Sequence, residues 1–148
     1  MHQTSNRRSD QLMARIVLTN AFISVGGVDL SDLVSSVSLS STFDVVETTA
    51  FSSSSTKTRV AGLADNSITL EFHQDYATGE VEQTIYPLLG TVAAVIVKPN
   101  GSTTSAFNPS YTCQAVISEW TPLNGAVGEL ATASVSWPVT GAITKAVA

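Results

Sequence analysis

The chain has 148 residues, enough for one domain with a buried core, and only 13% of them are charged. Its formal net charge of −5 argues against tight binding to nucleic acid, because proteins that neutralise phosphates are normally basic. The single cysteine, Cys113, excludes an intrachain disulfide, and the sequence contains no run of about 18 apolar residues that would predict a membrane span.

The first twelve residues, MHQTSNRRSDQL, are polar and lack the apolar segment of a secretory signal. Their composition predicts a disordered or extended leader over residues 1–12. Met13 opens the first strand-like stretch, so translation could begin at Met1 or at Met13. Residues 13–148 are predicted to form a single domain.

Three stretches in the first half of the chain have the pattern of strands. Residues 15–25 are apolar in both alternating sets, and Gly26-Gly27 then predicts a tight turn. Residues 33–39 place Leu33, Val37 and Leu39 on one face and serines on the other. Residues 67–73 alternate in the same way, with Ile68, Leu70 and Phe72 opposite Thr69, Glu71 and His73. Each of the last two strands therefore has one apolar and one polar face.

Between those two strands lies a polar excursion that includes four consecutive serines, and residues 41–59 are predicted to form a long loop. Loops of this length are uncommon unless they are functional or disordered. The stretch GEVEQTIYPLLG, residues 79–90, predicts one short helix over roughly residues 79–89, capped by Thr78 and closed by Gly90, with Pro87 shortening it. Strands are then expected at residues 91–98, 111–120 and 130–139. The fold class is mainly β: a β-sandwich or open barrel of about seven strands with one flanking helix.

No constellation in the sequence supports catalysis. His73 has Glu71 and Asp75 as neighbours, but ordinary polar residues belong on that face. Cys113 alternates with apolar residues and is interpreted as a core residue, while Trp120 and Trp137 are interpreted as core residues or interface anchors. We therefore expect no enzyme activity, no cofactor and no metal.

Three stretches together resemble the major tail tube proteins of long-tailed, siphovirus-type bacteriophages, in particular those infecting actinobacteria. They are MARIVLTNAFISVGGVDLSD, RVAGLADNSITLEFHQDYATGEVEQTIYPLLGT and NPSYTCQAVISEWTPLNGAVGELATASVSW. The resemblance implies a structural virion protein with a small β-sandwich, which forms hexameric rings that stack into a hollow tube. It also implies assembly in the host cytoplasm, with tape measure and tail terminator proteins as further partners. DNA would pass through without specific binding, and no membrane insertion is expected. The leader departs from the family, whose chains usually begin near the equivalent of Met13.

The resemblance also suggests roles for particular residues. The polar faces of the two cleanest strands would line the tube, which assigns the lumen to Ser36, Ser38, Thr69 and Glu71. The excursion would be an assembly loop reaching neighbouring subunits and rings, with Phe51 inserted between apolar side chains of a neighbour. Its two cations, Lys57 and Arg59, would meet acidic residues across the joint. The residues assigned to this loop are Glu47, Phe51, Ser52, Ser53, Ser54, Ser55, Lys57 and Arg59.

Two alternative functions remain open at this point. One is another virion component of similar fold, such as a capsid decoration or head–tail joining protein. The other is a non-viral adhesion or carbohydrate-binding module, since a fold does not fix a function.

Overall fold

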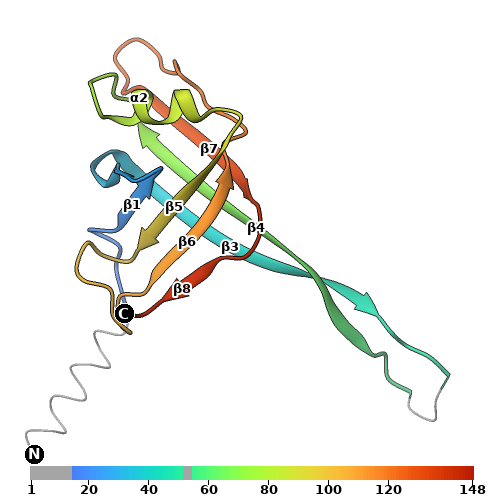
Figure 1. The fold of residues 1–148 in the computed structure, drawn as a ribbon. Coiled ribbons are helices and arrows are strands. Elements are labelled where there is room, and N and C mark those ends of the chain that lie inside the picture. Colours follow the sequence, from blue (N-terminus) through green and yellow to red (C-terminus); the bar gives the residue numbers. More distant parts are fainter. Residues whose placement is uncertain (1–14, 52–54) are drawn as a thin grey trace, which may run out of the picture.

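A computed structural model describes residues 15–51 and 55–148. The predicted leader, residues 1–12, lies outside the described residues, and so do Ser52, Ser53 and Ser54. The described residues form eight strands, one short α-helix and two 3-10 helices (Figure 1). The predicted mainly β fold with one short helix is confirmed, with eight strands in place of about seven.

All the strands belong to one antiparallel sheet. Its order is β2-β1-β5-β6-β7-β4-β3, and β8 pairs with β6 off this path. The strands are β1 (Phe22–Val25), β2 (Val28–Asp29), β3 (Val34–Glu47), β4 (Arg59–His73), β5 (Val92–Lys98), β6 (Ser110–Val116), β7 (Thr132–Val139) and β8 (Thr144–Ala146). The helical elements are η1 (Ser31–Leu33), α2 (Val81–Ile85) and η2 (Tyr86–Leu88).

The core lies on the inner face of the curled sheet. Strand alternation brings Leu70 and Phe72 of β4 against the same side as Val135 and Trp137 of β7, and all four are buried. Trp120 completes this cluster, with its ring edge-on to Phe72 at a centroid distance of 5.7 Å. Both indole N–H groups have acceptors: Trp137 donates to the carbonyl of Glu119 at 2.9 Å and Trp120 to the Glu82 carboxylate at 3.2 Å. The tryptophans are therefore core residues.

The barrel is open between β1 and β3. No hydrogen-bonded ladder joins these strands in the described chain, and a groove of about 510 Å³ runs there, lined by Leu18, Asn20, Ile23, Ser35 and Val37 among others. The prediction of a strand from residue 15 was wrong in its extent, because β1 begins only at Phe22. Residues 15–20 are exposed and have no strand partner, so an apolar pattern there does not become a ladder.

The helix is shorter than the sequence predicts. Residues 79–89 were expected to be helical, whereas α2 spans five residues and continues as the 3-10 turn η2, which contains Pro87. Thr78 is not the N-cap; Glu80 holds that position and makes no side-chain capping bond. Val81 and Ile85, four residues apart on the helix, are both buried. Proline lacks the amide proton that a longer helix needs, which explains why the α-helix stops.

The turn and strand boundaries follow the sequence more closely. Gly26 and Gly27 have φ values of 59° and 87° and join β1 to β2, as predicted for a tight hairpin. The predicted strands at 111–120 and 130–139 are confirmed as β6 and β7, although β6 ends at Val116. The short strand β8 was not predicted.

Candidate assembly surfaces

A two-stranded arm projects from the body of the molecule. Beyond the pair Asn66↔Val139, β4 has no further pairing with β7, and its outer part pairs with β3 alone. We call residues 43–64 the arm; it contains the distal ends of β3 and β4 and the connection between them (Figure 1). The prediction of a loop over residues 41–59 was therefore wrong for residues 41–47, which continue β3.

The described residues assigned to the assembly loop, Glu47, Phe51, Ser55, Lys57 and Arg59, lie at the distal end of the arm. Glu47 ends β3 and pairs in register with Arg59, which begins β4, while Phe51 is fully exposed at the tip. The Lys57 ammonium lies 3.7 Å from the Glu47 carboxylate, with both side chains more than half exposed. The expected partner of this cation was an acidic residue of another subunit; within the chain, Glu47 is its partner. Such an exposed ion pair stabilises the fold only slightly, by about 0.2–1 kcal/mol.

Threonine hydroxyls continue the pairing past the ends of the strands. The Thr48 amide donates to the Thr58 carbonyl at 2.8 Å, and the two hydroxyls lie 2.9 Å apart. The Thr58 amide also donates to the Thr49 hydroxyl at 3.0 Å. Residues 48, 49 and 58 thus form a hairpin end held by local hydrogen bonds, and Ser55 is exposed.

The arm exposes apolar side chains that nothing else in the described chain covers. Leu63 is 81% exposed, and four more apolar residues are about half exposed or more: Phe43, Val45, Val46 and Val60. They occur on both strands of a ribbon that has no third strand and no core. An isolated two-stranded ribbon is at best marginally stable in water. A partner surface is therefore needed to bury these residues.

A β-bulge sits in the middle of the arm. The register shifts between Phe43 and Val45, so that Gly62 and Leu63 together oppose Asp44. A Cβ atom on Gly62 would lie 3.2 Å from a Val46 methyl and 3.3 Å from the Asp44 Cβ, which explains the glycine. Bulges increase local twist and re-aim side chains. This one includes the highly exposed Leu63.

The four residues assigned to the lumen share one exposed face. Ser36 pairs with Glu71 and Ser38 with Thr69 across β3 and β4. The face extends onto β7, where Thr69 lies opposite Ser136. We call this surface the hydroxyl face; its members are Ser36, Ser38, Ser40, Ser67, Thr69, Glu71, Ser134 and Ser136. The structure thus brings together Ser36, Ser38, Thr69 and Glu71.

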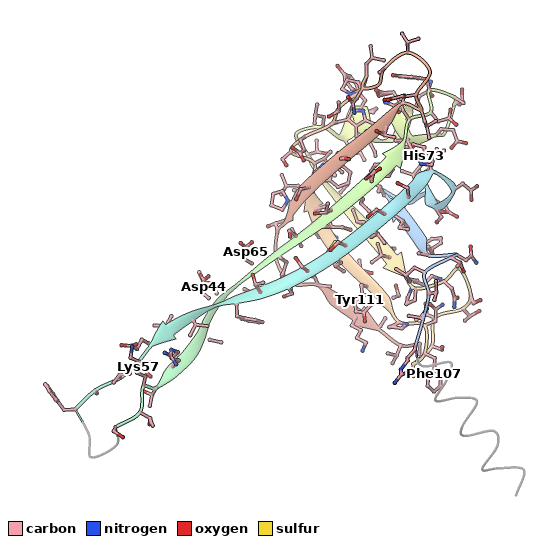
Figure 2. The ribbon with its side chains drawn as sticks, turned by 180° about the vertical axis from the view of Figure 1, so that it is seen from behind. Asp44, Lys57, Asp65, His73, Phe107 and Tyr111 are labelled. Carbon is pink, nitrogen blue, oxygen red and sulfur yellow. The ribbon has the colours of Figure 1, made fainter. Side chains whose placement is uncertain are left out.

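Hydroxyls on this face bond to one another. The Ser40 and Ser67 hydroxyls lie 3.2 Å apart, and the Thr69 hydroxyl donates to that of Ser136 at 3.3 Å. At the base of the arm, Asp44 and Asp65 lie on the same side of the ribbon (Figure 2). The surface is therefore polar, with one carboxylate, that of Glu71, among the serines and two more, those of Asp44 and Asp65, toward the arm.

The outer edge of β3 is a second unpaired feature. This strand is the last in the sheet and is 14 residues long, and no strand of the described chain pairs with its outer side. An unpaired edge of this length can pair with a strand of another chain, and monomeric proteins normally keep such edges short, charged, bulged or covered. The edge and the arm belong to the same hairpin.

The polar residues considered for catalysis lie on β4 or just after it. Glu71 is exposed and His73 half-buried on β4, and no group of three or more His, Cys, Asp or Glu side chains converges anywhere in residues 15–51 and 55–148. Cys113 is buried as predicted, and burial raises the pKa of its thiol. No helix in the described part of the chain is long and apolar enough to cross a membrane.

The apolar residues of the arm were missed from the sequence. Their signal was the clusters FDVV and RVAGL on either side of the serines, in which β-branched and aromatic residues favour strand. FDVV was assigned to the predicted loop and residues 60–63 to no element, because neither cluster alternates cleanly.

Comparison with known proteins gives a fold but no close relative in sequence. No family model matches the chain, and no curated protein matches it. A solved structure that matches is a chain from an extracellular contractile injection system, the PVC sheath-tube complex in its extended state. It has a TM-score of 0.68 and 11% identity, covering 95% of this chain and 98% of the other. A chain from the anti-feeding prophage (AFP) baseplate matches with a TM-score of 0.56 and 10% identity, covering 89% and 96% respectively.

Proposed function

We propose that this chain is the subunit of a hollow tail tube. The observation that carries the proposal is the arm, which exposes apolar side chains from both strands of an unsupported ribbon. The unpaired edge of β3 adds hydrogen-bonding groups that side-by-side subunits would satisfy. The fold shared with a chain of a sheath-tube complex supports the same reading.

In this proposal the subunits form hexameric rings, and the rings stack into the tube. The hydroxyl face lines the lumen, with Ser36, Ser38, Thr69 and Glu71 on its wall. A neutral-to-acidic wall repels phosphate or leaves it unbound, whereas a basic wall would hold DNA by counterion release. The wall is therefore suited to a conduit through which DNA travels without specific binding.

The tube would belong to a siphovirus-type phage tail, with tape measure and tail terminator proteins as its partners. One of the similar chains comes from a contractile injection system by its description, so a contractile tube is the second candidate. Gene neighbourhood separates the two: a sheath gene beside this one indicates a contractile system, and a tape-measure gene without a sheath indicates a long flexible tail.

Negative-stain microscopy of the purified chain tests the proposal. Tubes of indefinite length with a central channel are expected as concentration rises. Closed single rings indicate a head–tail joining protein, trimers indicate a capsid decoration protein, and a persistent monomer indicates an adhesion or carbohydrate-binding module. Each of these last three results contradicts a tube subunit.

A further inference from the structure

The body of the molecule has two opposite ends. Strand β5 runs from Val92, paired with Val116, to Lys98, paired with Phe22, and so connects them. We call one the helix end; it contains α2, η2 and the loop before β7, residues 73–91 and 117–132. We call the other the terminal end, residues 15–22, 98–111 and 143–148. Figure 1 shows α2 at one end and the C-terminus at the other.

Charge is divided between these ends. The helix end carries five carboxylates and no Lys or Arg: Asp75, Glu80, Glu82, Glu119 and Glu129. The terminal end carries three cations and no Asp or Glu: Arg15, Lys98 and Lys145. Two copies therefore attract when unlike ends meet and repel when like ends meet. Charge of this pattern selects a head-to-tail arrangement.

The terminal end also presents an exposed aromatic side chain on a hydrogen-bonded loop. Phe107 is 85% exposed in the loop between β5 and β6, and Figure 2 shows it at this end of the body. The next residue, Asn108, is only 4% exposed. Its side-chain amide donates hydrogen bonds to the backbone carbonyls of Asn100, Ser102 and Thr103 at 2.9–3.3 Å.

Further bonds fix the same loop from its other side. The Asn108 side-chain oxygen accepts the Asn100 amide at 3.1 Å, and backbone bonds join Ser105 and Asn108 in both directions. The Phe107 amide donates to the Ser105 hydroxyl. A loop already held in one conformation loses little entropy when its exposed side chain binds. Phe107 is thus arranged as a binding anchor.

The helix end offers a matching surface. A shallow depression of about 450 Å³ lies over α2 and η2 and is lined by Glu82, Gln83, Tyr86 and Pro87. Tyr86 is more than half exposed, so the depression has an aromatic wall. The Glu82 carboxylate at its rim is held in place by the Trp120 indole. An aromatic ring beside a fixed carboxylate suits an apolar anchor with cations around it.

We propose that the terminal end of one copy docks on the helix end of the next, with Phe107 in the depression beside Tyr86 and Pro87. This contact rests on the proposed tube and names the surfaces through which successive rings meet. Its two sides are different, so the contact is heterologous and repeats without closing. The stack therefore has a direction, with the helix end of every subunit facing the same way.

Cysteine pairing tests the contact directly. Phe107→Cys protein is mixed with Tyr86→Cys protein under mild oxidation, and a disulfide-linked dimer is expected on a non-reducing gel. A matched control mixes Phe107→Cys with Thr144→Cys, which puts both new thiols on terminal ends; this pair should cross-link at least tenfold less. Tyr86, Phe107 and Thr144 are all exposed, so the cysteine variants should still fold, which circular dichroism can check. Equal cross-linking in the two mixtures would overturn the proposal.

A charge exchange provides the second measurement. Lys145→Glu and Glu129→Lys are each expected to raise the critical concentration for elongation about twofold to fivefold at low salt, and the chain carrying both changes should recover most of the loss. Phe107→Ala should raise it at least tenfold. If the parent chain forms tubes and all these variants match it, the end-to-end contact is wrong and the tube stands. A parent chain that never elongates contradicts both proposals.

Discussion

A leucine-to-alanine change at two positions of β4 should separate folding from assembly. Leu63 lies in the arm and is 81% exposed, whereas Leu70 lies in the core and is 0% exposed. The substitution removes three carbon atoms, worth about 2.4 kcal/mol when fully buried at about 0.8 kcal/mol per carbon. The same chemical change therefore acts on two different equilibria.

For the isolated subunit, only the buried fifth of Leu63 counts, so Leu63→Ala should cost about 0.5 kcal/mol and lower the melting temperature by about 1–2 °C. Leu70→Ala should cost about 2–5 kcal/mol and lower it by about 5–20 °C. For elongation, burial of the exposed part of Leu63 against a neighbour is worth about 2 kcal/mol. Its loss should raise the critical concentration roughly 25-fold.

Thermal unfolding below the critical concentration measures the first effect, and pelleting of polymer across a concentration series measures the second. Leu63→Ile keeps the apolar area and should elongate like the parent chain. A Leu63→Ala protein that pellets at the parent's concentration would show that the arm stays in solvent in the assembly, and the role of the arm would have to be given up.

The other predictions concern the tip, the hydroxyl face and the core. Phe51→Ala should weaken elongation more than Lys57→Ala, because an aromatic buried at an interface is worth more than a screened ion pair; parity between the two in the pelleting assay would count against insertion of the ring. Thr69→Lys combined with Glu71→Lys should leave tubes intact but slow DNA release at low salt, measured by dye binding to emerging DNA, and unchanged release would contradict the lumen assignment. Burial raises the pKa of Cys113, so its thiol should stay protonated to higher pH in the folded chain than in the unfolded chain. The contribution of this thiol to the free energy of unfolding should be largest below its pKa in the unfolded chain and should fall as pH rises above that value. Ellman's reagent should react quickly with the thiol only after denaturation, and fast reaction of the native protein would contradict the burial.

The body of the fold could be predicted because its strands alternate against a core. Ile68 to Phe72 has one buried and one exposed set, and that period determines both the strand and its faces. The lumen residues were grouped correctly on one face for the same reason. Their role in a tube stays a prediction, since it depends on copies that a single chain does not contain.

The arm could not be predicted in the same way. In Phe43 to Val46 the apolar residues fall on both faces, because neither face meets a core within the chain, so no alternation marks the strand. Its partner is a stretch beyond the serines, and that pairing depends on register and not on local pattern. Residues 15–21 show the reverse error: their composition favours a strand, but they pair with no strand of the described chain, and residues 18–21 only line the groove between β1 and β3.

The sheet order also determines when the hairpin becomes anchored during synthesis. The β3–β4 hairpin is complete by residue 73, but its neighbour in the sheet is β7, which lies near the end of the chain. At the base of the arm, Asn66 donates to the carbonyl of Gly141, 75 positions away. A nascent chain therefore carries this hairpin without β7 until residue 139 has been made, and pairing across this separation is slow to form. In the proposed tube, the arm would gain the support of β7 only after translation has passed residue 139, which would delay polymerisation.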